Sequence, residues 1–126
     1  MTDQQLELLR AGRHLGVVAT LGDHGAPQTS VVWVDTDGEH VVFNTKPARA
    51  KGRNLERDPR LSITVCDRDD PYKYFEVEGT AELQEEGAGD HIDELSRRYD
   101  GKPFHTATER VIVRVHATRI LDYGVS

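Results

Sequence analysis

The chain has 126 residues, of which 30% are charged, and this length predicts one domain, over residues 1–126, with a modest core. Its formal net charge of −6 argues against a general nucleic-acid binder, because neutralising phosphates requires a basic surface. The single cysteine excludes an intrachain disulfide, and no apolar run reaches the length of a membrane span.

One helix and three strands are predicted at the start of the chain. Thr2 and Gln5 fit a capping box, which predicts a helix over residues 3–12 that ends at Gly12. Strands are predicted over residues 16–21, 27–34 and 40–45. The last two are joined by a hairpin turn at 35–38, and the short turns indicate an antiparallel meander.

A short basic helix is predicted next, with Pro47 near its first turn and its end by Asp58. Its positive residues are Lys46, Arg49, Lys51, Arg53 and Arg57. Free N–H groups, the helix dipole and the hydroxyl of Thr45 favour an anion here, so we predict a phosphate cradle. The alternative is a solvated basic face paired with neighbours such as Glu56.

The second half of the chain completes a mainly β pattern. Strands are predicted over residues 61–66, 74–83 and 111–115, the last continued or extended by 119–123. The strand over 74–83 alternates apolar residues with glutamates, which indicates that the glutamate face is exposed to solvent or to an interface. A helix over 90–99 precedes Gly101. About six strands, three helices and no βαβ alternation predict a small closed antiparallel barrel.

No metal site and no nucleophile are predicted. The six histidines show no ligand spacing, and the acidic loop at 67–70 lacks the glycine and distal glutamate of a calcium loop. Cys66 lies in an apolar strand, where an inert thiol is expected. The cysteine count and an N-terminus without a signal-peptide pattern predict a cytoplasmic protein without a membrane partner.

Four pieces of the chain share a wider pattern: residues 16–28, 43–60, 72–81 and 110–115. Together they resemble the split β-barrel flavin and deazaflavin oxidoreductases related to pyridoxamine 5′-phosphate oxidase. The branch that uses the deazaflavin coenzyme F420 is the most similar. This resemblance implies a six-stranded antiparallel split barrel, of the type that binds FMN, in a homodimer with cofactors at its interface.

The resemblance also implies a cofactor site. Thr45, Arg49 and Lys51 would hold the cofactor phosphate, with help from the N–H of Ala50. Residues 27–31 would run beside the ring, and two tyrosines would come from the facing subunit. The implied cofactor-binding residues are Gln28, Thr29, Ser30, Val31, Asn44, Thr45, Lys46, Arg49, Ala50, Lys51, Arg53, Asn54, Tyr72 and Tyr74.

Two departures from the family pattern bear on the cofactor and substrate. Pyridoxamine phosphate oxidases carry a basic residue on the second strand, where this chain has residues 28–31, and residues 120–126 lack their C-terminal basic motif. Both argue against pyridoxal phosphate synthesis. Lys46 and Arg53 suit the anionic tail of F420, and FMN remains the alternative cofactor.

The implied chemistry is hydride transfer from the reduced cofactor to an electrophilic small molecule such as an enone, a quinone or a tetrapyrrole. No catalytic residue is assigned, since Tyr72, Tyr74 and water are all possible proton donors. Two alternatives stay open: an FMN-dependent oxidoreductase of the same fold, and a non-catalytic protein that binds a flavin or deazaflavin.

Overall fold

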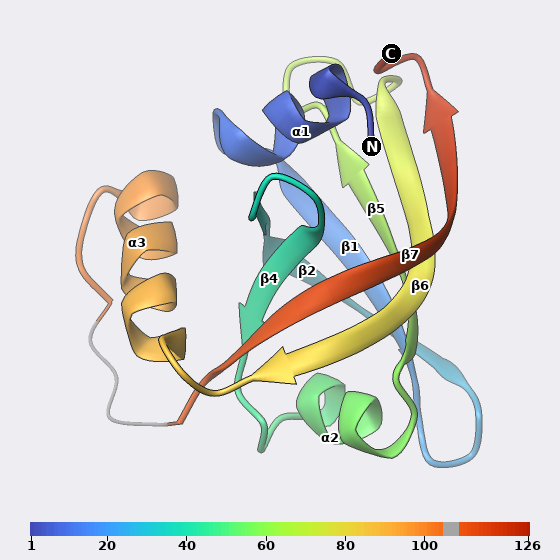
Figure 1. Cartoon of the computed structure of the whole chain (residues 1–126), viewed down its shortest axis with the longest axis vertical. Coiled ribbons are helices and arrows are strands. Elements are labelled where there is room, and N and C mark those ends of the chain that lie inside the picture. The colour runs from blue at the N-terminus through green and yellow to red at the C-terminus, as the bar shows by residue number, and fades with distance from the viewer. Residues whose placement is uncertain (105–108) are drawn as a thin grey trace.

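The computed structural model describes residues 1–104 and 109–126. Within them, seven strands form one sheet, and three helices pack around it (Figure 1). The elements are α1 (Asp3–Arg10), β1 (Leu15–Leu21), β2 (Pro27–Trp33), β3 (Asp35–Thr36), β4 (Val41–Thr45), α2 (Ala50–Arg57), β5 (Arg60–Cys66), β6 (Tyr74–Gln84), α3 (Ala88–Asp100) and β7 (Val111–Tyr123). The mainly β class is confirmed, and the additional strand is the two-residue β3. No helix in these ranges is both long and apolar enough to cross a membrane.

The sheet is antiparallel and curls on itself, as the split barrel requires. Its order is β2-β1-β5-β6-β7-β4-β3, and only Val34 separates the two edge strands in the sequence. The two edges of the sheet therefore meet at Val34. Fully buried side chains fill the interior, among them Val18, Phe43, Ile63, Phe75 and Val113. Helix α2 lies across one end of the curled sheet and α1 near the other (Figure 1).

The predicted three-strand meander is wrong. β1 and β2 form a hairpin, but β4 pairs with β7, where Phe43 lies opposite Val113. The predicted turn at 35–38 begins instead with β3, which pairs with Val41 and Val42. The chain thus leaves one edge of the sheet and enters the other within a few residues.

Helix α3 holds the sheet together at this split. The Tyr99 hydroxyl accepts a hydrogen bond from the Val34 N–H at 3.0 Å and donates to the His14 carbonyl at 2.5 Å. The Arg98 guanidinium donates to the Val34 carbonyl. Val34 is fully buried, and buried backbone groups need partners, so these side chains replace the strand neighbour that Val34 lacks.

We expect Tyr99→Phe to lower the free energy of unfolding by about 1–3 kcal/mol, because the buried Val34 N–H loses its partner. The phenyl ring keeps its stacking on Trp33, whose centroid lies 5.3 Å away. Denaturant unfolding followed by circular dichroism measures the change. Tyr123→Phe is the control, because its ring also stacks but its hydroxyl bonds no described residue; about 0.5 kcal/mol or less is expected. Equal effects of the two changes would contradict this account of the split.

The predicted capping box is confirmed, and the predicted end of this helix needs correction. The Thr2 hydroxyl accepts from the Gln5 N–H at 3.1 Å, and the Gln5 side chain accepts from the Thr2 N–H at 2.9 Å. Helix α1 ends at Arg10 rather than at Gly12. Gly12 lies just beyond the helix, with φ of 69°, and leads the chain into β1.

Helix α2 begins at Ala50, so Pro47 lies near its first turn, as predicted, but outside the helix. The Arg49 N–H donates to the Lys46 carbonyl at 3.1 Å, and this bond closes a separate turn before the helix. The end of the helix is as predicted, with Asp58 as its C-cap.

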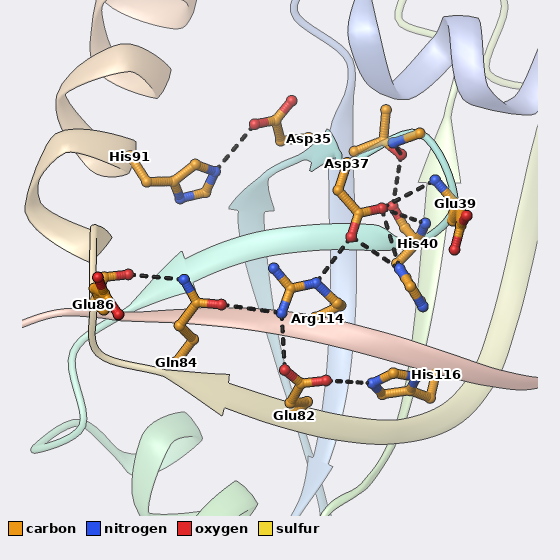
Figure 2. A network of polar contacts seen from close by, with 12 residues as sticks. Asp35, Asp37, Glu39, His40, Glu82, Gln84, Glu86, His91, Arg114 and His116 are labelled. Atoms are coloured by element: carbon orange, nitrogen blue, oxygen red, sulfur yellow. Dashed lines mark hydrogen bonds and ion pairs between the residues drawn. The ribbon is translucent and has the colours of Figure 1, made fainter.

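The outer face of β6 and β7 carries the polar side chains that the alternation predicts. Arg114 forms ion pairs with Glu82 and with Asp37, each at 2.9 Å, and His116 lies 2.7 Å from Glu82 (Figure 2). These contacts tie the β3–β4 hairpin to the two long strands. The last predicted strand and its extension form one strand, β7, without a break.

Candidate anion-binding pocket

A pocket of about 410 Å³ lies where β2, β4, α2 and α3 come together. Its lining combines two kinds of side chain. The polar and basic part consists of Asn44, Thr45, Lys46, Arg49, Lys51 and Arg110. The apolar part consists of Leu15, Val31, Val32, Trp33, Ile92, Leu95 and Phe104. We call this hollow the basic pocket.

A larger hollow, of about 480 Å³, lies over β1, β5 and β6. Arg60 is the one basic residue among the described residues that line it, and its guanidinium pairs with Asp58 at 2.7 Å. Glu78 adds a carboxylate. This hollow is therefore not suited to an anion, and the basic pocket is the better candidate for the predicted phosphate cradle.

The local sequence sets the start of α2 against the end of β4. No side chain caps the first turn of α2, where Arg49 is the N-cap residue. The first N–H groups of a helix have no intrahelical partner and carry the positive end of its dipole. Gly52 allows this close packing, because a Cβ there would lie 2.5 Å from the Lys46 carbonyl oxygen and 2.7 Å from the Pro47 Cα.

We expect Gly52→Ala to destabilise the protein by about 1–3 kcal/mol, because the added methyl group meets backbone that cannot rotate away. Gly89→Ala in α3 is the matched control, since its Cβ would meet nothing within 4 Å. That control should stabilise the protein by up to about 1 kcal/mol, as alanine does in a helix. Thermal unfolding of the two variants compares them, and shifts of the same sign and size would contradict the close approach.

The electrostatics of the basic pocket favour a bound anion. Burial lowers the pKa of Lys51, and the charges of Arg49 and Arg110 lower it further. Burial and the charge of Arg49 likewise lower the pKa of Arg110. Within residues 1–104 and 109–126, no carboxylate forms an ion pair with any of these three cations. An anion among them would relieve their mutual repulsion.

Two hydrogen bonds fix the cations of the pocket to the surrounding strands. The Lys51 Nζ donates to the Ser30 Oγ at 3.2 Å, which joins α2 to β2. The Arg110 Nε donates to the Asn44 Oδ1 at 2.7 Å, which joins the start of β7 to β4. Both cations are partly buried and are therefore held in place rather than free in solvent.

The structure brings six of the predicted cofactor-binding residues together in the lining of the basic pocket: Val31, Asn44, Thr45, Lys46, Arg49 and Lys51. Two more lie next to it, since Ser30 accepts from Lys51 and Ala50 lies between Arg49 and Lys51. Sequence reasoning missed Arg110. Its place becomes evident only from the pairing of β4 with β7, which sets Thr45 opposite Val111.

Other predicted residues lie in different surroundings. Asn54 is buried, and its Nδ2 donates to the Thr20 Oγ1 at 3.0 Å and to the Gln28 Oε1 at 2.7 Å. These bonds fasten α2 to β1 and β2. Arg53 turns back to donate to the Ala48 carbonyl, and none of these side chains lines the basic pocket.

Thr29, Tyr72 and Tyr74 also lie outside the pocket lining of a single chain. Thr29 is exposed on β2, and Tyr72 is 90% exposed. Tyr74 stacks on Tyr123 with ring centroids 4.5 Å apart. A role for either tyrosine therefore depends on a second copy of the chain.

Metal-ligating side chains do not gather in the part of the chain that the structure describes. No group of three or more His, Cys, Asp or Glu residues there could hold a metal ion. His105, one of the six histidines, lies outside the described residues.

Comparisons with known proteins agree with this architecture. The family model described as pyridoxamine 5′-phosphate oxidase matches residues 1–123. A solved protein named F420 reductase is 32% identical over 96% of this chain and 98% of its own, with a TM-score of 0.82. A conserved hypothetical protein from Mycobacterium tuberculosis is 28% identical over 99% of this chain and 86% of its own, with a TM-score of 0.77. A putative pyridoxamine 5′-phosphate oxidase from Listeria innocua, 20% identical over 95% of both chains with a TM-score of 0.75, shares the fold.

Proposed function

Since this chain belongs to the pyridoxamine 5′-phosphate oxidase family, we propose that it is an oxidoreductase that holds a flavin-type cofactor, F420, in the basic pocket. Reduced F420 would supply a hydride for an electrophilic small molecule such as an enone, a quinone or a tetrapyrrole. The observation that carries this proposal is the composition of the pocket. Cations that form no ion pair with any carboxylate of the described residues adjoin an apolar wall, which suits a ligand with an anionic group and a flat aromatic ring.

The chain's own groups have separate parts in this proposal. The Thr45 hydroxyl and the N–H of Ala50 donate hydrogen bonds to the phosphate, and Arg49, Lys51 and Arg110 supply its opposing charge. These contacts bind and orient the cofactor. The cofactor ring would carry the hydride, so no nucleophilic side chain is needed.

The edge strand β2 offers a place for the ring. Among the described residues β2 pairs with β1 alone, so part of its backbone N–H and C=O groups have no strand partner there. Residues 28–31 can therefore donate to and accept from the polar edge of a ring. Val31 and Trp33 add apolar surface to the pocket lining, which would exclude water from the ring face.

The number of cations supports F420 over FMN. A single phosphate is matched by Arg49, Lys51 and Arg110, and Lys46 in the same lining adds a further charge for an anionic tail. The similar protein named F420 reductase supports the same choice. FMN is the second candidate, because the same cations suit its phosphate.

A second copy of the chain would complete the site. Leu15, Val17 and Val31 are 43%, 42% and 62% exposed, and Val17 lies opposite Val31 across β1 and β2. This apolar surface adjoins the basic pocket and would be covered in a homodimer. Tyr72 and Tyr74 of the other copy would then flank the ring. Sedimentation analysis tests this step, and a monomer at micromolar concentration would contradict it.

Turnover tests the enzymatic part of the proposal. Reduced F420 is mixed with the protein and a panel of enones, quinones and tetrapyrroles, and reoxidation of the cofactor is followed by its fluorescence. We expect protein-dependent reoxidation with at least one class of electrophile. Tight binding of the cofactor without turnover across the panel would instead favour the non-catalytic alternative.

A further inference from the structure

We infer that His91 is a positioning residue that, in its neutral form, holds Asn44 and through it sets the Arg110 guanidinium in the basic pocket. This inference rests on the proposed function for its effect on cofactor affinity. The hydrogen bonds of His91, Asn44 and Arg110 are features of the structure itself, and they connect α3 to the basic pocket.

The contacts form one continuous chain from β3 to the pocket. His91 points from α3 toward Asp35, and its Nε2 lies 3.1 Å from the Asp35 Oδ2 (Figure 2). Its Nδ1 lies 3.1 Å from the Asn44 Nδ2. On its other side, Asn44 accepts from the Arg110 Nε at 2.7 Å.

Two neighbours fix the orientation of the Asn44 amide. The Ala88 carbonyl can only accept, and it lies 2.9 Å from the Asn44 Nδ2. The Arg110 Nε can only donate, and it points at the Asn44 Oδ1. The amide therefore cannot flip without placing two acceptors together on one side and two donors together on the other.

This orientation of the Asn44 amide determines which nitrogen of the neutral His91 ring carries the proton. The Asn44 Nδ2 donates toward the His91 Nδ1, so this nitrogen must be the acceptor. A neutral imidazole has a single N–H, which then lies on Nε2 and donates to Asp35. A proton on Nδ1 would face an N–H of Asn44 and break the chain of hydrogen bonds.

Charged groups lie on both sides of His91. Asp35 of β3 lies on one side, with Arg98 of α3 behind it at 3.2 Å. Burial raises the pKa of Asp35, but hydrogen bonds from His91 and the Thr36 N–H, together with Arg98, hold that pKa below its ordinary value. Asp35 is thus an ionised acceptor. On the other side, Asn44 separates His91 from Arg110.

The consequence is that cofactor affinity depends on the acceptor that His91 offers to Asn44. Without such an acceptor, Asn44 is no longer held on this side, and the Arg110 guanidinium loses its fixed position. His91 and Asn44 are nearly buried, which leaves little room for water to replace the lost contact.

Two variants test the effect on binding. F420 affinity is measured by fluorescence titration at pH 8 for the wild-type protein, His91→Phe and His91→Asn. We expect His91→Phe, which has no acceptor, to bind about 10-fold more weakly than wild type.

His91→Asn separates positioning from packing. Its Oδ1 can take the place of Nδ1 as an acceptor, so its affinity at pH 8 should stay within about 3-fold of wild type. An unchanged affinity in His91→Phe, or an equal loss in the two variants, would overturn the inference.

A second readout does not depend on the cofactor. Nitrogen-15 NMR of the free protein reports which ring nitrogen of His91 carries the proton, with the resonances assigned by their loss in His91→Asn. At pH 8 we expect the proton on Nε2. A proton on Nδ1 would overturn the inference. Failure of the wild-type protein to bind any cofactor, with the proton on Nε2, would overturn the proposed function and leave the hydrogen-bond chain supported.

Discussion

Lys51→Ala is expected to weaken F420 binding by roughly 10- to 150-fold, which corresponds to about 1.5–3 kcal/mol. The reason is the setting of this side chain. Its Nζ is held by the Ser30 Oγ at 3.2 Å, beside Arg49 and Arg110. Burial has already removed part of its hydration, so a charge-assisted bond to an anion is worth more there than on the open surface.

Fluorescence titration at two salt concentrations measures this loss. Lys102→Ala is the matched control, because it removes the same charge from an exposed residue that does not line the basic pocket. We expect the control to change the affinity by about 2-fold or less. The affinity of Lys51→Ala should also depend less on salt than that of the wild type, since one cation is missing. An unchanged affinity in this variant would remove Lys51 from the phosphate site.

Gly79→Ala is expected to cost about 3 kcal/mol of stability or more. Gly79 lies at the irregularity between β6 and β7, where the strand register shifts after Glu78. A Cβ there would lie 2.2 Å from the His116 carbonyl oxygen and 3.1 Å from the Ala117 Cα. Both atoms belong to the backbone of β7, which is held along its length by its partner strands and cannot yield as a flexible side chain can.

Gly22→Ala is the control for that substitution. Its Cβ would meet its nearest neighbour, the Ala26 carbonyl oxygen, at an ordinary 3.4 Å. We expect a change of about 1 kcal/mol or less. Denaturant unfolding compares the two proteins, and the amount of soluble protein on expression gives a second measure if Gly79→Ala does not fold. Equal stability of the two variants would show that β7 can move away from β6.

The sequence predicted those features of the fold that depend on local patterns. The alternation over residues 74–83 gave the buried and polar faces of β6, and the capping pair Thr2 and Gln5 gave the start of α1. The concentration of basic residues before Asp58 identified α2 and the candidate phosphate site. Each of these patterns lies within one element, where side-chain periodicity or capping chemistry decides the outcome.

Long-range pairing could not be predicted in the same way. The meander was the simplest topology for three short-linked strands, yet β4 pairs with β7, far along the chain. The split depends on Val34, whose backbone is satisfied by Tyr99 and Arg98 from α3. No local sequence pattern predicts these hydrogen bonds, because they form only when α3 packs against the assembled sheet.

The same limit explains which site residues were missed. Arg110 reaches the basic pocket only because β7 begins beside the end of β4. The family resemblance implied that Asn54 and Gln28 contact the cofactor, and this stays a prediction. Their side chains bond to each other in the structure, a contact that spacing along the chain does not reveal. Direct roles for Tyr72 and Tyr74 stay predictions that depend on the homodimer.

Titration of the purified wild-type protein with F420 and, separately, with FMN at two salt concentrations tests the central claim most directly. The basic pocket predicts saturable binding that weakens with salt, since Arg49, Lys51 and Arg110 have no carboxylate partner among the described residues. F420 should bind more tightly than FMN. Tighter binding of FMN would make this a flavin protein. Saturable binding of neither ligand would contradict the account and leave the basic residues as a solvated surface.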